Sequence, residues 1–139
     1  KNKRLEKQTM KIEVSELDVT LTENFIQFCC NQLGVYPDLI AIEGWDEPFK
    51  DGALGLCYEV DAKQEYLIMV SKKDRNITEI YNTIAHEMIH VKQFMKQNLS
   101  VSASEEHKPI YSERWWEIEA SENSTDIVKK YVDKLYSMA

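Results

Sequence analysis

Residues 76 to about 97 carry the strongest helical pattern in the chain, and this segment most constrains the fold. Asn76 can cap the helix, and Glu79, three residues later, completes a capping-box pattern. Apolar residues recur at three- and four-residue steps along two lines: Ile77, Ile80, Ile84, Met88, Val91 and Met95 on one, and Tyr81, Ala85 and Ile89 on the other. A helix that is apolar on two sides is usually central, so we expect the domain to be built around it.

The rest of the chain predicts strands and two further helices. Alternating or apolar runs predict strands at residues 11–18, 39–42, 54–60 and 66–70, the last two joined as a hairpin through 61–65. Helices are predicted from about 22 to 33, ended by Gly34, and from 115 to about 136. Residues 44–52 and 99–113 predict loops. This order predicts an α+β domain with a small mixed sheet.

The length of 139 residues fits one domain, residues 1–139, of which 1–10 are expected to be a flexible basic terminus. No apolar run approaches the length needed to span a bilayer, so no membrane partner is expected. A cytoplasmic location is expected, or the host cytoplasm if the chain is phage-encoded. The first residue is Lys and not Met, so a leader that has been removed stays open.

Charge and cysteine content narrow the function classes. The net charge of -7 argues against a broad nucleic-acid-binding face, although the basic residues at the start leave an electrostatic arm open. The three cysteines, Cys29, Cys30 and Cys57, have no regular spacing and predict neither a disulfide framework nor a thiolate metal site. Buried free thiols in a reducing compartment are expected.

The central helix carries the sequence His86-Glu87-Met88-Ile89-His90, an HExxH motif. Side chains four residues apart project from the same face of a helix, so His86 and His90 can reach one zinc ion. Glu87 is rotated by about 100° around the axis. Its carboxylate can approach a metal-activated water, whose pKa zinc lowers to about 7, and serve as general base and then general acid.

HExxH is short and also arises by chance, with the two histidines serving only as capping or packing residues. The context favours a metal site, because a buried central helix would not carry two histidines and a glutamate without a partner for them. His86 and His90 are moreover two of the three histidines in the chain. A catalytic zinc needs a third protein ligand and an open position. The candidates downstream are Glu117 and His107.

The HEMIH sequence followed by EIEAS, residues 117–121, resembles the gluzincin group of zinc peptidases. Residues 111–120 also resemble a segment of small metallopeptidase-like proteins of phages and bacteria. The resemblance covers residues 77–124, roughly a third of the chain. It implies a zincin-like fold, peptide-bond hydrolysis with Glu87 as catalytic residue, and a C-terminal helix that supplies Glu117 as the third ligand beside His86 and His90.

One position departs from the gluzincin pattern. The group usually has an Asp or Asn where this chain has Ser121, and that residue orients a ligand histidine. The Ser121 hydroxyl could accept the same hydrogen bond, less strongly because it carries no charge. Glu119, two residues from Glu117, is expected to face elsewhere and to be solvated.

A competing resemblance is to SprT-like proteases, which act on DNA-bound proteins and take their third ligand from a His in a later loop. His107 would be that ligand here, although Lys108 departs from the small residue expected after it. A third alternative is a non-catalytic protein that uses a zincin fold for binding or regulation. The intact Glu87 argues against that alternative.

Further groups could complete the site. Tyr111, Arg114 and His107 could stabilise the oxyanion, although each is equally well explained as loop packing or surface charge. The zincin resemblance implies that the strand at residues 66–70 is an edge strand that pairs with an extended substrate, and an ordinary core strand is the alternative. The expected cofactor is Zn²⁺, with manganese or iron as other ions that this donor set accepts. The expected partner is a protein or peptide substrate.

Overall fold

The structure is a computed structural model that describes residues 10–100 and 114–138. In that part the order of elements is β1 (Lys11–Ser15), α2 (Val19–Leu33), β2 (Leu39–Trp45), a 3-10 turn η1 (Lys50–Gly52), β3 (Gly55–Asp61), β4 (Glu65–Ser71), α3 (Ile77–Lys96) and α5 (Trp115–Met138). The predicted α+β class with a small mixed sheet is confirmed. The predicted basic terminus lies almost wholly outside the described residues, and of the predicted loop at 99–113 only Leu99 and Ser100 are described, both helical.

The sheet has four strands in the order β1-β2-β4-β3. β1 pairs with β2 and β2 with β4 in parallel, whereas β3 and β4 form the predicted antiparallel hairpin. β4 is therefore an interior strand, and the expectation that residues 66–70 form the substrate-binding edge is wrong. The edge beside β4 is β3. A sequence shows which strands join as a hairpin, but not on which side of that hairpin β2 will pair.

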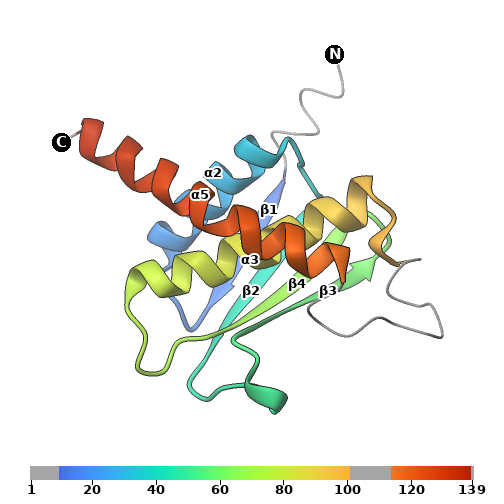
Figure 1. Cartoon of the computed structure of the whole chain (residues 1–139), viewed down its shortest axis with the longest axis horizontal. Helices are drawn as coiled ribbons and strands as arrows, with labels where there is room; N and C mark the ends of the chain where they lie inside the picture. The colour runs from blue at the N-terminus through green and yellow to red at the C-terminus, as the bar shows by residue number, and fades with distance from the viewer. Residues whose placement is uncertain (1–9, 101–113, 139) are drawn as a thin grey trace.

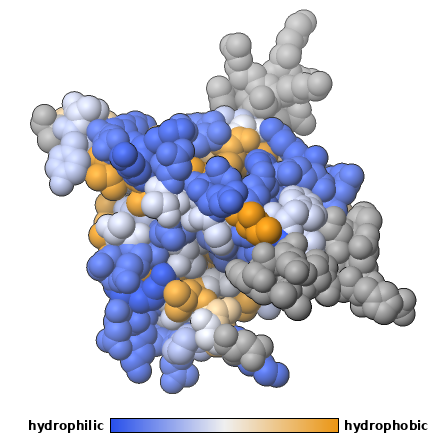
Figure 2. Space-filling view, viewed as in Figure 1, coloured by the Kyte–Doolittle hydropathy of each residue, from blue (hydrophilic) through white to orange (hydrophobic). Residues whose placement is uncertain are grey.

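The helices lie on one face of the sheet in two layers (Figure 1). α2 and α3 pack on the strands, and α5 lies across α3 on the side away from the sheet. The surface seen from the α5 side is largely hydrophilic, with only scattered apolar residues (Figure 2). α5 forms the outer layer because it buries one face against α3 and exposes a polar face to solvent.

Three predicted boundaries were wrong. The first strand was predicted for residues 11–18, but β1 ends at Ser15. α2 begins at Val19 and not near residue 22, because the Asp18 carboxylate accepts a hydrogen bond from the backbone N–H of Leu21 at 2.9 Å and caps the helix. Val19 and Leu21 are apolar but exposed. The first turn of α2 therefore does not follow the amphipathic pattern from which the start of the helix was predicted. β2 runs on to Trp45, because Gly44 pairs with Val70 on β4 and so continues the ladder.

The core lies between the sheet and the helices. It includes Ile40 and Ile42 of β2, Ile68 and Val70 of β4, and several residues on each of the three helices. An aromatic cluster joins the helices: the Phe25 ring of α2 stacks on Tyr81 of α3 at 4.4 Å between centroids and meets Tyr131 of α5 edge-on at 5.0 Å. Aromatic pairs in these arrangements add stability beyond the area they bury.

Of the residues predicted to face inward on α5, Leu135 is the exception. Trp116, Ala120, Ile127 and Tyr131 are buried, whereas Leu135 is 47% exposed. The C-terminal end of α5 extends past the other helices (Figure 1). Cys29 and Cys30 are buried free thiols, as predicted, and burial raises the pKa of both. Among the described helices, none combines the length and the apolar character needed to cross a membrane.

Candidate metal centre

The cap of α3 fixes where the HExxH side chains emerge. The Asn76 side chain accepts a hydrogen bond from Glu79 N at 2.9 Å, and the Glu79 side chain accepts one from Asn76 N at 2.9 Å. The predicted capping box is therefore confirmed. Of the predicted apolar stripe, Ile84, Met88 and Val91 are buried, whereas Ile77 in the first turn is half exposed. The packed helix presents its histidines on a face turned toward α5.

Glu117, in the first turn of α5, meets both histidines. Nε2 of His86 lies 2.9 Å and Nε2 of His90 lies 3.1 Å from the same oxygen, Oε1 of Glu117. The three candidate ligand atoms all lie within 4.8 Å of one another. His86, His90 and Glu117 are thus close enough to hold one metal ion, and the chain brings the third from 27 residues beyond His90.

The donor set fits a divalent transition-metal ion. Two imidazole nitrogens and one carboxylate oxygen form a common ligand set of catalytic zinc sites. Burial acts to raise the pKa of Glu117, but the hydrogen bonds from both imidazoles outweigh it and hold that pKa well below its usual range. Burial acts to lower the pKa of His90, and the hydrogen bond with Glu117 reverses this and raises it. The pocket therefore favours positive charge, which a bound cation would supply.

Glu87 is buried beside the triad. Burial raises the pKa of its carboxyl group to about 7, with the charge of Glu117 adding to the rise and the two histidines opposing it. A Cβ atom on Gly55 of β3 would lie 2.7 Å from Oε2 of Glu87 and 2.6 Å from Cγ2 of Thr83. Only glycine leaves room for the backbone of β3 to lie this close to the carboxylate.

A cleft of about 860 Å³ runs along this surface. His86, Glu87, His90 and Glu117 line it together with the segment from Ala53 to Cys57, and Gly55 of that segment lies directly against Glu87. Apolar lining comes from Phe94, Leu99 and Trp116. The cleft therefore contains the candidate metal ligands, a buried carboxyl group and one strand of the sheet.

β3 pairs with β4 on one side only, among residues 10–100 and 114–138. Ser71 N donates to Leu54 O at 2.9 Å. Hydrogen-bonded pairs alternate in an antiparallel ladder, so Leu56 and Tyr58 continue the bonding to β4 and the backbone groups of Gly55 and Cys57 point the other way. Within the described residues no strand pairs with this edge.

The other predicted site residues have different outcomes. Arg114 lines the cleft, and its backbone oxygen accepts hydrogen bonds from the N–H groups of Glu117 and Ile118 at 3.0 Å each. Ser121 is exposed on α5, and no hydrogen bond among the described residues joins it to His86 or His90. The structure thus gives no support to the orienting role expected for Ser121. His107 and Tyr111 lie outside the described residues.

Two residues of the site were missed. Gln93, fully buried on α3, has Oε1 2.7 Å from Nδ1 of His90, and its Nε2 donates to Oε1 of Glu119 at 2.7 Å. The expectation that Glu119 is solvated is wrong, because this long side chain reaches across the α3–α5 contact and also accepts from Lys92 at 2.9 Å. The position of Gln93 could have indicated its role. It lies three residues after His90, and so on the same side of a helix that was predicted to be buried.

Comparison of the chain with protein-family models, with curated proteins and with solved structures gave no match.

Proposed function

We propose that the chain is a metallopeptidase of gluzincin type that hydrolyses peptide bonds with a zinc ion held by His86, His90 and Glu117. The observation that carries the proposal is the meeting of both imidazoles on one carboxylate oxygen, at 2.9 and 3.1 Å, on the wall of a cleft that also contains the buried Glu87. A site that only stabilised the fold would not need a second carboxyl group beside it. Two imidazoles and one carboxylate suit zinc best among the common metals.

A bound zinc ion would supply Lewis acidity, which polarises the peptide carbonyl and makes water more acidic. Glu87 accepts a proton from the attacking water as its oxygen bonds to the carbonyl carbon. Glu87 then gives that proton to the amine nitrogen as the C–N bond breaks, so the products are a carboxylic acid and an amine. In the metal-free site burial raises the pKa of Glu87 to about 7. A bound cation would lower that pKa and so favour the ionised carboxylate that accepts the proton.

The edge of β3 is the proposed position of the substrate backbone. An extended peptide can add to an open strand edge through main-chain hydrogen bonds, which gives affinity with little dependence on side chains. Gly55 keeps this edge close to Glu87, so a peptide bonded to β3 would lie along the wall that holds the ligands. β3 thus takes the role first expected for residues 66–70.

The ligand geometry favours this proposal over the SprT-like alternative. Glu117 already contacts both imidazoles, so the third-ligand position has an occupant without His107. The buried, pKa-shifted Glu87 likewise favours catalysis over a zincin fold kept only for binding, because burying a carboxyl group costs stability that a binding module has no need to lose.

The test is hydrolysis of a peptide library by wild type and Glu87→Gln, with cleavage products identified by mass spectrometry. We expect Glu87→Gln to keep its zinc and to lose about 10²- to 10⁴-fold in rate. Glu122→Gln, an exposed change on α5, is the matched control and should retain full activity. Full zinc together with full activity in Glu87→Gln would contradict the mechanism.

A further inference from the structure

We propose that Gln93, backed by Glu119, is a positioning residue that fixes the tautomer and the ring orientation of His90 for metal binding. This inference rests on the metal centre of the proposed function, but not on the identity of any substrate. Among the described residues, Ser121 makes no hydrogen bond to His86 or His90 and so does not replace the partner that the gluzincin pattern gives a ligand histidine. The Gln93–Glu119 pair supplies such a partner from different positions, and it serves His90.

The hydrogen bonds of Gln93 determine which way its amide points. Its Nε2 donates to the backbone oxygen of Trp116 at 2.9 Å and to Oε1 of Glu119 at 2.7 Å. A backbone carbonyl and a carboxylate accept hydrogen bonds but cannot donate them, so the NH₂ group must face these two atoms. The amide oxygen therefore faces His90, with 2.7 Å between Oε1 and Nδ1.

This orientation fixes the proton of His90. An amide oxygen only accepts, so Nδ1 of His90 must carry a hydrogen. In a neutral imidazole the other nitrogen, Nε2, then presents its lone pair, and Nε2 is the atom that faces Glu117 and His86. Without Gln93 the neutral ring would be free to place its proton on Nε2, which cannot then bind a metal ion.

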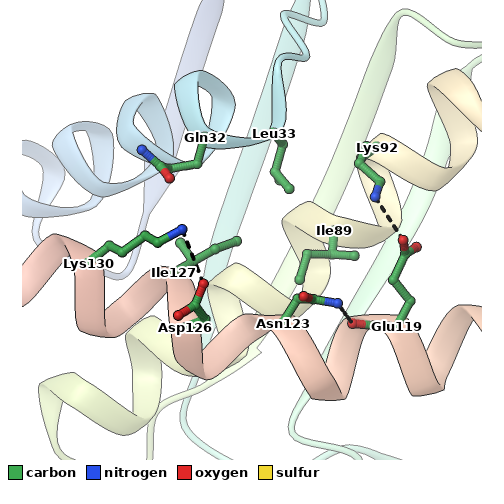
Figure 3. A pocket seen from close by; sticks show the side chains of 9 residues that line it. All are labelled: Gln32, Leu33, Ile89, Lys92, Glu119, Asn123, Asp126, Ile127 and Lys130. Carbon is green, nitrogen blue, oxygen red and sulfur yellow. Dashed lines mark hydrogen bonds and ion pairs between the residues drawn. The ribbon is translucent and has the colours of Figure 1, made fainter.

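Glu119 holds the amide from the outer side. Figure 3 shows Lys92 and Glu119 joined across the helices, at the rim of a small pocket between α2, α3 and α5. The carboxylate therefore joins a solvent-facing ion pair, with 2.9 Å between Lys92 Nζ and Glu119 Oε2, to the fully buried amide of Gln93. A charged acceptor strengthens the hydrogen bond that it receives, so it holds the amide in this orientation.

The alternative is that Gln93 only joins α3 to α5 through its bond to the Trp116 backbone. A structural role and a positioning role both predict that removing the amide lowers stability, because the acceptors would lose a buried donor. Only the positioning role predicts a loss of metal affinity in the folded protein. Partners of ligand histidines typically contribute about 10- to 100-fold to metal affinity.

The experiment measures zinc affinity, by competition with a chromophoric chelator, and thermal stability of the metal-free full chain. Gln93→Met keeps the volume and removes all three side-chain hydrogen bonds of Gln93, to His90, to the Trp116 backbone and to Glu119. Gln93→Glu combined with Glu119→Gln exchanges carboxylate and amide, so His90 keeps an acceptor, although the backbone oxygen of Trp116 loses its donor and stability is expected to fall. Thr125→Val is the matched control, because it removes a different α3–α5 contact, the hydrogen bond from Thr125 to Asn82 at 3.2 Å.

We expect Gln93→Met to lose about 10- to 100-fold in zinc affinity, the exchanged double variant to recover to within about threefold of wild type, and Thr125→Val to bind zinc as wild type does. Wild-type affinity in a folded Gln93→Met chain would overturn the inference while leaving the metal centre intact. No zinc binding by the wild type would instead overturn the metal centre itself.

A second readout needs no variant. In the zinc-loaded wild type we expect a nitrogen NMR signal of His90 with a proton on Nδ1 and the metal on Nε2. Zinc on Nδ1, or an Nδ1 without a proton, would overturn the inference even if Gln93→Met failed to fold.

Discussion

Gly55 brings the backbone of β3 against the side chain of Glu87, because a Cβ atom at Gly55 would lie only 2.7 Å from the Oε2 atom of Glu87. The open edge of the sheet and the buried carboxyl group are thereby parts of one surface. β3 and α3 are separated by β4 in the sequence, and their close contact here depends on the absence of a side chain at Gly55.

We predict that Gly55→Ala lowers the hydrolysis rate at least tenfold without changing zinc content, because the new methyl group displaces the Glu87 carboxylate from its position. Overpacking of this kind typically costs about 1–3 kcal/mol of stability. The combined variant Gly55→Ala with Thr83→Ser removes the second close contact, at Cγ2 of Thr83, but not the one at Glu87. It should regain stability and not activity. Restored activity in the double variant would show that the clash with Thr83, and not displacement of the Glu87 carboxylate, caused the loss of activity in Gly55→Ala.

We predict that metal-free Glu87→Gln is more stable than metal-free wild type at pH 8, by roughly 3 kcal/mol. The pKa of Glu87 rises from 4.5 to about 7 on folding. A raised carboxyl pKa gives stability that is fully present below pH 4.5 and is lost as the pH rises through 7. The advantage of the glutamine variant should therefore shrink below pH 7 and vanish near pH 4.5. Equal denaturation midpoints at pH 8 would contradict the burial of an ionisable Glu87.

We predict that zinc binding releases protons at pH 6. The hydrogen bond with Glu117 raises the pKa of His90 in the metal-free site, so part of the population carries a proton on Nε2 that the ion must displace. Calorimetric titrations in buffers of different ionisation enthalpy measure this number directly. A binding enthalpy that does not depend on the buffer at pH 6 would contradict the charge state assigned to His90.

We predict that Phe25→Ala lowers the free energy of unfolding by about 3–5 kcal/mol. The Phe25 ring is fully buried and contacts both Tyr81 and Tyr131, so its loss leaves a cavity where all three helices meet. Chemical denaturation measures the change. Tyr136→Ala, at a ring that is 77% exposed on the end of α5, is the control and should change stability by less than about 0.5 kcal/mol. A small loss for Phe25→Ala would mean that the cluster is not part of the stabilising core.

The sequence predicted those parts of the fold that local patterns determine. The capping box at Asn76, the helix that follows it and the left-handed end of α2 at Gly34 all depend on residues within a few positions of one another, and all are confirmed. The parts of the fold that could not be predicted depend on which strands pair across the sheet. The strand order β1-β2-β4-β3, which makes β3 the edge, is a choice between sides of a hairpin that no local pattern records.

The candidate site divides in the same way. The spacing of His86 and His90 along one helix puts both rings on one face, so those residues could be predicted from the sequence alone. The approach of Glu117 required a resemblance, because it depends on where α5 crosses α3. The Gln93–Glu119 contact was missed because each side chain taken alone resembles ordinary helix surface, and only the crossing brings them within 2.7 Å.

The most direct test of the central claim is the metal content per chain of purified wild type, Glu117→Ala and His107→Ala, measured in parallel. We expect close to one zinc ion per chain in wild type and in His107→Ala, and a large loss in Glu117→Ala. Loss in His107→Ala alone would contradict the ligand set and support the SprT-like alternative. A wild-type chain that binds no metal would contradict the metal centre.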